Sequence, residues 1–206
     1  MKKPFIGVAG NIGVGKTTFS EIISKKLNIS VYYESVDDNP YLSDFYNDMK
    51  RWSFNLQIYF LQHRFKNHLD ISKSETGVIQ DRTIYEDVSI FAYNLYKMGT
   101  MSKRDWQTYK NLFDNMTQFL EKPDLIIYLK ASTDTLINRI KSRNRNYEKD
   151  IDRVYLHRLN IYYKNWFSSI KEFNVLEIDT NNFNIFKDLD KLNKICDDIK
   201  NKLNKL

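Results

Sequence analysis

A nine-residue stretch with the sequence GNIGVGKTT, Gly10–Thr18, is rich in glycine and ends in Lys-Thr-Thr. The apolar run Phe5–Ala9 precedes it, and apolar residues at helical spacing follow it. A strand, a glycine-rich turn and a helix in this order are the context of a phosphate-binding loop, whose N–H groups face the anion with the positive end of the helix. A chance glycine-rich turn is the alternative, but it does not explain why motif and context agree.

The pattern GxxxxGK[ST] is complete from Gly10 to Thr17. In such a loop the lysine, here Lys16, reaches the β- and γ-phosphates, and the Thr17 hydroxyl ligates Mg²⁺. We therefore predict a nucleoside triphosphate site formed by Gly10, Asn11, Ile12, Gly13, Val14, Gly15, Lys16, Thr17 and Thr18.

Two carboxylates end predicted strands. Glu34 closes the run Ser30–Glu34, and Asp81 closes the run Val78–Asp81. Ligands of a parallel sheet bind beyond the carboxyl ends of its strands, so we expect both acids near the phosphate loop. An acid that closes an apolar strand is typical of a second Mg²⁺-binding element, which makes Asp81 a metal candidate beside Thr17. The alternative for either residue is an ordinary surface carboxylate.

Three polar residues and a phenylalanine lie on the predicted helices in positions that could form a binding face. Gln57 and Arg64 are seven residues apart and share one face of a helix, from which they could read a planar base by paired hydrogen bonds. Asp87 and Phe91 are four apart and are neighbours on the next helix. A solvated polar stripe is the alternative for Gln57 and Arg64.

A basic cluster follows a later helix. Arg139, Arg143 and Arg145 lie around the helix end, and Glu148 follows in the polar segment RNRNYEKD. Such a segment could close over a triphosphate as a lid, at about residues 143–150. Cations favourably placed at a helix C-terminus are the alternative.

The elements that must position these residues alternate along the chain. Strands are predicted at Phe5–Ala9, Ser30–Glu34, Val78–Asp81, Leu125–Leu129 and Val175–Ile178. Helices are predicted near Thr17–Asn28, Lys50–Lys73, Ile84–Lys97, Ser102–Leu120, Thr133–Ser142, Ile151–Ile170 and Asn184–Leu203. This alternation predicts an α/β fold with a parallel five-stranded sheet flanked by helices. We find no linker or repeat, so we expect one domain over residues 1–206.

Composition narrows the class of protein. The net charge of +6 suits anionic ligands, and because basic and acidic residues are interleaved we favour small anions over nucleic acid as partners. The single cysteine, Cys196, cannot form an internal disulfide, which fits a reducing compartment. No apolar stretch approaches the ~20 residues of a membrane span, so we expect a cytoplasmic protein without a membrane partner.

Taken together, the motifs resemble those of the deoxyribonucleoside kinases, the group of deoxycytidine, deoxyguanosine and deoxyadenosine kinases. The resemblance extends to about residue 170 and rests on five motifs in order: GNIGVGKTT, the Glu of YYESV, RWSFNLQIYFLQHR, DRTIYEDVSIFAYNLY and RIKSRNRNYE. It implies a P-loop type sheet with an arginine-rich lid, ATP as phosphate donor, Mg²⁺, a deoxynucleoside as the second substrate, and a homodimer formed through a helical bundle.

The resemblance also implies roles for individual residues. Glu34 matches the glutamate that approaches the 5′-hydroxyl and serves as general base, and Arg82 matches the arginine near the 5′-oxygen. Many members have Glu-Arg-Ser where this chain has Asp81-Arg82-Thr83, which leaves open whether Asp81 meets the metal directly or through water. Asp81 is also the alternative general base.

The remaining matches concern the two substrates. Residues matched to the nucleoside site are Tyr46 and Glu148 at the sugar 3′-hydroxyl, Gln57, Arg64 and Asp87 at the base, and Trp52 and Phe91 as walls. Lys16 and the loop match the phosphate site, and Arg139, Arg143 and Arg145 match the lid.

The predicted activity is transfer of the γ-phosphoryl group of ATP to the 5′-hydroxyl of a deoxynucleoside in nucleotide salvage. An ionised Asp87 can only accept hydrogen bonds, which favours the amino group of adenine or cytosine over the O4 of thymine. Arg64 could donate to guanine O6, so guanine stays open. Resemblance to the bacterial purine-preferring members favours deoxyadenosine. Alternatives are deoxyguanosine or deoxycytidine kinase, thymidylate kinase, and a non-enzymatic P-loop regulatory or nucleic-acid-binding protein.

Overall fold

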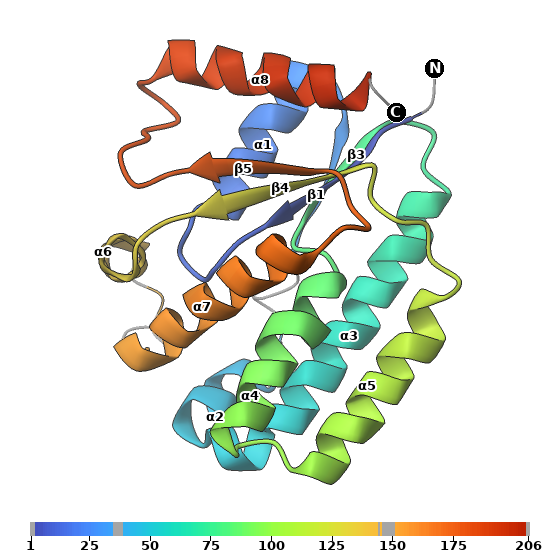
Figure 1. Ribbon diagram of the computed structural model, residues 1–206, viewed down its shortest axis with the longest axis vertical. Coiled ribbons are helices and arrows are strands. Elements are labelled where there is room, and N and C mark those ends of the chain that lie inside the picture. Colours follow the sequence, from blue (N-terminus) through green and yellow to red (C-terminus); the bar gives the residue numbers. More distant parts are fainter. Residues whose placement is uncertain (1–2, 35–38, 144, 146–150, 205–206) are drawn as a thin grey trace.

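Five parallel strands form one sheet in the order β2-β3-β1-β4-β5 (Figure 1). The computed structural model describes residues 3–34, 39–143, 145 and 151–204. The strands are β1 (Phe5–Ala9), β2 (Ser30–Tyr32), β3 (Val78–Asp81), β4 (Leu125–Lys130) and β5 (Val175–Asp179). Val8 of β1 is in register with Asp81 of β3, so the segment after β1 begins level with the end of β3.

Helices connect the strands and cover both faces of the sheet. They are α1 (Lys16–Leu27), α2 (Leu42–Asn47), α3 (Met49–Ser72), the π-helical turn η1 (Asp87–Ala92), α4 (Tyr93–Met98), α5 (Lys103–Thr117), α6 (Thr133–Arg143), α7 (Arg153–Ser169) and α8 (Leu189–Leu203). None of the described helices is both long and apolar enough to span a membrane.

Each face of the sheet has its own hydrophobic core. On one face, Phe19 of α1 and Ile195 of α8 pack with Val8 of β1. On the other, Leu56 of α3 and Tyr163 of α7 belong to a larger core that also takes in η1, α4 and α5. Figure 1 shows α1 and α8 together on one side of the sheet, and α3, α4, α5 and α7 on the other. This arrangement confirms the predicted parallel sheet between two helical layers.

Three local features differ from the sequence prediction. Strand β2 ends at Tyr32 and not at Glu34, because only Ser30 to Tyr32 pair with β3, the sole neighbour of this edge strand. The short helix α2 was not predicted. The predicted helix Ile84–Lys97 is divided into η1 and α4, and the wider turn of η1 begins at Asp87. Such π-helical turns are frequent at functional sites.

Candidate active site

The segment between β1 and α1 wraps closely around the start of α1. Gly15, directly before α1, has φ of 99°, in the left-handed region that side chains rarely adopt. At Gly13, also with positive φ, an added Cβ would lie 2.6 Å from Cγ1 of Ile140 on α6. Glycine at these two positions therefore permits both the tight turn and the close packing of the loop on α6.

Lys16 is buried at the centre of this loop. Its Nζ donates hydrogen bonds to the carbonyl oxygens of Gly10, at 3.1 Å, and Asn11, at 3.3 Å. Burial, together with the positive charge of Arg82, lowers the pKa of Lys16 to about 8. The ammonium group is thus held by two loop carbonyls, from which it can be drawn toward an anion in the cavity.

Thr17 and Asp81 meet at the base of the loop, as the sequence predicts for a metal site. The Thr17 hydroxyl donates to Asp81 Oδ2 at 2.5 Å. Asp81 Oδ1 is buried and accepts no hydrogen bond within the described residues, and burial raises the pKa of this carboxyl. A hydroxyl and an unpartnered carboxylate oxygen are the kind of ligands with which Mg²⁺ is held against substrate phosphates. The residues present therefore fit Mg²⁺.

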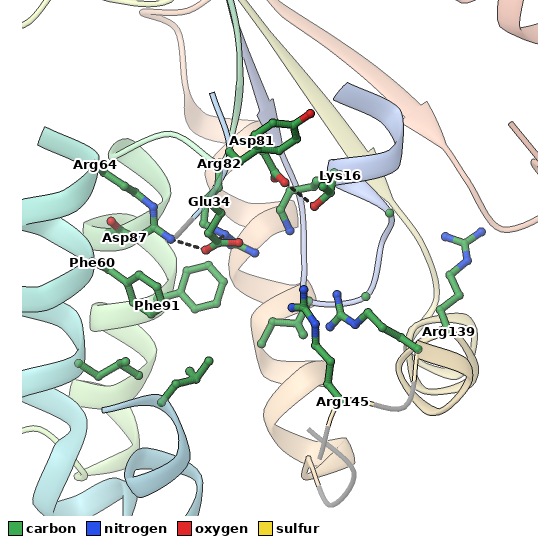
Figure 2. Close-up of a pocket in the computed structure, with 18 of the residues that line it drawn as sticks. Lys16, Glu34, Phe60, Arg64, Asp81, Arg82, Asp87, Phe91, Arg139 and Arg145 are labelled. Atoms are coloured by element: carbon green, nitrogen blue, oxygen red, sulfur yellow. Dashed lines mark hydrogen bonds and ion pairs between the residues drawn. The ribbon is translucent and has the colours of Figure 1, made fainter. Parts of the chain in front are cut away.

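Glu34 lies between two arginines. Its Oε1 accepts a hydrogen bond from Arg64 Nη2 at 2.5 Å and forms an ion pair with Arg82, whose Nε lies 2.9 Å away. Figure 2 shows Glu34 and Arg82 in the middle, with Arg64 and Asp87 on one side and Lys16 and Asp81 on the other. Burial alone would raise the pKa of Glu34, but Arg82 and Arg64 outweigh it and lower this pKa to about 2. The carboxylate is therefore ionised at neutral pH.

Arg82 reaches Glu34 from an unusual backbone conformation. Its φ of 68° is in the left-handed region, one of two such values at non-glycine residues of the described chain. This conformation directly after β3 is costly and persists only where other contacts fix it. Here the Arg82 N–H donates to the Val8 carbonyl at 3.0 Å, and its guanidinium lies 4.4 Å from the centre of the Phe91 ring.

A cavity of about 460 Å³ joins the phosphate loop to a second group of buried polar side chains. Arg64 forms an ion pair with Asp87 and lies 4.6 Å from the centre of the Phe60 ring. Gln57 Oε1, Arg64 Nε and Asp87 Oδ2 are buried without hydrogen-bond partners in the described part of the chain. Burial raises the pKa of Asp87 to about 6, although the adjacent Arg64 opposes this. Three residues with unused donors and acceptors can together recognise a planar heterocycle.

The predicted nucleoside-site residues are only partly brought together. Tyr46, Gln57, Arg64, Asp87 and Phe91 line the cavity. Trp52 is not among the residues that line the cavity. It lies nearer the start of α3 than Gln57, and its ring packs against that of Tyr41 with 5.7 Å between centroids. Glu148 lies outside the described residues.

The three predicted lid arginines have different surroundings. Arg143 and Arg145 line the cavity, and Figure 2 shows Arg145 near the phosphate loop. Arg139 also lines the cavity, but its guanidinium donates to the carbonyl oxygens of Val14, at 3.0 Å, and Thr180, at 2.5 Å, and to the Thr180 hydroxyl at 3.0 Å. Arg139 therefore ties the phosphate loop to the segment after β5. Most of the remaining predicted lid, residues 144 and 146–150, lies outside the described residues.

Comparison with known proteins decides the family. The sequence model described as "Deoxynucleoside kinase" matches residues 6–204. The chain belongs to the deoxynucleoside kinase family. It is 41% identical over 200 residues to the deoxyadenosine/deoxycytidine kinase of Bacillus subtilis, covering 96% of this chain and 92% of that protein. It is 45% identical over 168 residues to a deoxyadenosine kinase of Dictyostelium discoideum, covering 82% and 68%.

Solved structures agree with this assignment. The deoxyadenosine kinase of M. mycoides with bound dATP superposes with a TM-score of 0.83 at 33% identity, over 93% of this chain and 98% of that one. The five-stranded sheet therefore has the P-loop type fold of the deoxynucleoside kinases, and the chain is a phosphotransferase that acts on an alcohol group.

Two buried residues of this kinase were missed by sequence reasoning. Glu86 is fully buried and accepts from the Gly10 N–H at 3.1 Å, and Tyr163 is fully buried and donates to the Gly10 carbonyl at 2.8 Å. Glu86 directly precedes Asp87, so an acid beside a predicted site residue was a usable signal. Tyr163 lies in an aromatic-rich helix that resembles ordinary core, and nothing in the sequence distinguishes it.

Proposed function

We propose that this kinase transfers the γ-phosphoryl group of ATP to the 5′-hydroxyl of a deoxyribonucleoside, preferentially deoxyadenosine, in nucleotide salvage. The observation that supports this most strongly is that one and the same cavity is lined by Lys16 and Thr17 and by Gln57, Arg64 and Asp87. Phosphoryl transfer depends mainly on positioning the two substrates and on neutralising the charge of the phosphates. The cavity contains side chains that can do both.

The donor phosphates would bind at the loop Gly10–Thr18. Lys16, Arg143 and Arg145 carry the positive charges that would offset the charge of the phosphates. Thr17 and Asp81 would hold Mg²⁺, Asp81 directly or through water, and the ion would supply further charge neutralisation. Arg139 would act less directly, because its guanidinium is already bonded to the backbone of Val14 and Thr180.

Glu34 is the proposed general base. It would accept the 5′-hydroxyl proton as O5′ bonds to the γ-phosphorus and the bond from that phosphorus to the β-phosphate oxygen breaks, which releases ADP. Arg82, whose Nε lies 2.9 Å from Glu34 Oε1, would hold Glu34 in place and stabilise the reacting oxygen. Asp81 stays the alternative base, because its raised pKa makes it the stronger proton acceptor once it is ionised.

Asp87 and Gln57 would read the base, and Tyr46 and Glu148 would hold the sugar 3′-hydroxyl. The unpartnered Asp87 Oδ2 suits an amino group, which adenine N6 supplies, whereas thymine would place a carbonyl there. A buried acceptor facing another acceptor costs about 1–3 kcal/mol, roughly tenfold to a hundredfold in discrimination. Thymidine should therefore be a poor substrate.

Deoxyguanosine is the second candidate substrate. Arg64 Nε is buried without a partner and could donate to guanine O6. A deoxyguanosine kinase of Bacillus subtilis is also 43% identical over 160 residues, covering 76% of this chain and 74% of that protein. The two purines thus differ in which side chain reads the base edge, Asp87 for adenine and Arg64 for guanine.

The test is a steady-state comparison of kcat/KM with ATP and Mg²⁺ across the four deoxynucleosides, the ribonucleosides and dTMP. We expect deoxyadenosine to rank first and thymidine last among the deoxynucleosides. Preference for dTMP would make the protein a thymidylate kinase, and preference for thymidine would refute the role of Asp87. The same ranking measured with Asp87→Ala shows whether this residue sets the order.

We further propose that residues 1–206 form one kinase domain that acts in the cytoplasm as a homodimer, without a nucleic-acid or membrane partner. The side chains of Val154 and Ile161 on α7 are 61% and 45% exposed, which suits a helical interface. Light scattering after size-exclusion chromatography distinguishes a dimer of about twice 24.7 kDa from a monomer.

A further inference from the structure

Gly10, the first residue of the phosphate loop, is held on both of its backbone polar groups by buried side chains. Its N–H donates to Glu86 Oε2 at 3.1 Å. Its carbonyl oxygen accepts from the Tyr163 hydroxyl at 2.8 Å and from Lys16 Nζ at 3.1 Å. Glu86 directly precedes η1, and Tyr163 belongs to α7. Two segments that are distant in sequence thus contact one residue of the loop.

Only a carboxylate satisfies the surroundings of Glu86. Oε1 accepts from the Thr83 N–H at 3.1 Å, and Oε2 accepts from Gly10 and from the Tyr163 hydroxyl, the latter at 2.6 Å. Arg82 Nη1 lies 3.6 Å from the same Oε2. Every neighbouring group is a donor, and a carboxylate has only acceptors, whereas a glutamine would turn an NH₂ group toward at least one donor. Glu86 thus joins the start of the loop to the turn after β3.

Tyr163 has one hydroxyl proton and two acceptors within reach. Its oxygen accepts from Arg82 Nη1 at 2.9 Å, and its proton can go to the Gly10 carbonyl or to Glu86, but only to one at a time. While Lys16 donates to the Gly10 carbonyl, the Tyr163 proton is available to Glu86. When Lys16 turns to a phosphate, the Gly10 carbonyl loses that donor, and Tyr163 can replace it.

We propose that Tyr163 and Glu86 are positioning residues that keep Gly10 fixed and hydrogen-bonded while Lys16 moves from the loop carbonyls to the donor phosphate. This inference rests on the proposed use of the loop Gly10–Thr18 for the donor phosphates. The pair acts through Gly10 and also contacts Arg82, but it makes no hydrogen bond to Gln57, Arg64 or Asp87 in the described part of the chain. Its main effect should therefore be on binding of the donor.

The first test is the affinity for ADP, measured by titration calorimetry with Mg²⁺. We expect Tyr163→Phe to weaken ADP binding about 5- to 10-fold, the usual effect of losing one hydrogen bond, and Glu86→Gln to weaken it at least as much. The Kd for deoxyadenosine should stay within about twofold of the wild-type value, because the base-reading residues keep their contacts. An unchanged Kd for ADP in both variants would overturn the proposal.

Tyr85→Phe is the matched control. The Tyr85 hydroxyl is also buried and makes no hydrogen bond within the described part of the chain, and its ring packs on Phe113 and Phe173. The Tyr85→Phe substitution removes a buried tyrosine hydroxyl, as Tyr163→Phe does, but this hydroxyl makes no hydrogen bond to Gly10. Equal losses of ADP affinity in Tyr163→Phe and Tyr85→Phe would show a general packing effect and refute the positioning role.

The second test measures stability and needs no nucleotide. In a Lys16→Ala background, Tyr163 is the remaining side-chain donor to the Gly10 carbonyl among the described residues. The urea midpoint should therefore fall further in the Lys16→Ala/Tyr163→Phe double variant than the two single losses add up to. Additive losses would overturn the proposal. Failure of the wild-type protein to bind ADP would instead refute the proposed function, and this cycle would still report on Gly10.

Discussion

At the scale of single residues, the environment of each carboxylate decides what chemistry it can do. Glu34 has a pKa of about 2 because Arg82 and Arg64 outweigh its burial, whereas Asp87 has a pKa of about 6 because its burial outweighs the adjacent Arg64. The neighbouring charges and the burial of each group thus give two acids of one cavity very different pKa values. This difference in pKa leads to two predictions.

Replacing Glu34 by Gln keeps its shape and removes the proton acceptor. We expect kcat to fall about 10²- to 10⁴-fold, the usual contribution of a general base, with a smaller change in the Kd for deoxyadenosine. Asp81→Asn is the comparison, and single-turnover phosphorylation separates chemistry from product release. If Asp81→Asn shows the larger loss while ADP and Mg²⁺ still bind, Asp81 is the base.

Asp87 predicts a pH-dependent choice of base. Its pKa is raised, so the anionic acceptor form exists above about pH 6 and is lost as the pH falls through that value. A protonated Asp87 can donate to thymine O4 and no longer favours an amino group. We expect the ratio of kcat/KM for deoxyadenosine over thymidine to fall between pH 7 and pH 5. In Asp87→Asn the ratio should be flat over this range, and a parallel fall there would assign the effect to another group.

The sequence alone identified those site residues that end a predicted strand or belong to a contiguous motif. Glu34 and Asp81 were found because they follow apolar strands, and Lys16 because its motif is contiguous. Glu86, Phe60 and Tyr163 were missed, because their importance comes from contacts across distant segments. The Tyr163 hydroxyl, for example, meets Gly10 across 153 positions of sequence.

At the scale of elements, the hydrophobic pattern predicted all five strands but not every local departure from regular structure. A π-helical turn at Asp87 and a left-handed backbone at Arg82 have no signature in residue periodicity. They are imposed by packing and by hydrogen bonds to β1, as in the bond from the Arg82 N–H to Val8. For the residues at and after these irregular points, the direction of the side chains could not be predicted from the sequence alone.

Helix α6 provides a prediction that separates two arginines of the predicted lid. Arg139 bonds to backbone carbonyls, so Arg139→Ala should lower the free energy of unfolding by about 1–2 kcal/mol. Arg143→Ala should lower kcat by about 10- to 10³-fold, because Arg143 lines the cavity and would act on developing phosphate charge. Urea unfolding and kcat measured on both variants test the contrast. Unchanged kcat and ATP KM in Arg143→Ala would make it an ordinary helix-end cation.

At the scale of the whole molecule, the cavity is a meeting point of segments from both halves of the chain. The segment after β2 supplies Glu34, α3 supplies Arg64, and η1 supplies Asp87. From the second half of the chain, α6 supplies Arg143. Arg64 contacts both acids at once, so the group that reads the base also holds the proposed catalytic carboxylate. The fold therefore links recognition of the base to the acidity of Glu34 through one guanidinium.

This link predicts how the pH profile responds when Arg64 is removed. Arg64→Met takes away one of the three cations, Arg82, Arg64 and Lys16, that lower the pKa of Glu34, so this pKa should rise. To exclude the titration of Asp87, the comparison is made in an Asp87→Asn background, with and without Arg64→Met. We expect the acidic limb of kcat/KM for deoxyadenosine, measured at saturating ATP, to move to higher pH only when Arg64 is absent. Coincident acidic limbs would mean that Arg82 and Lys16 set the acidity of Glu34 without Arg64, and the base-reading and catalytic groups would then be independent.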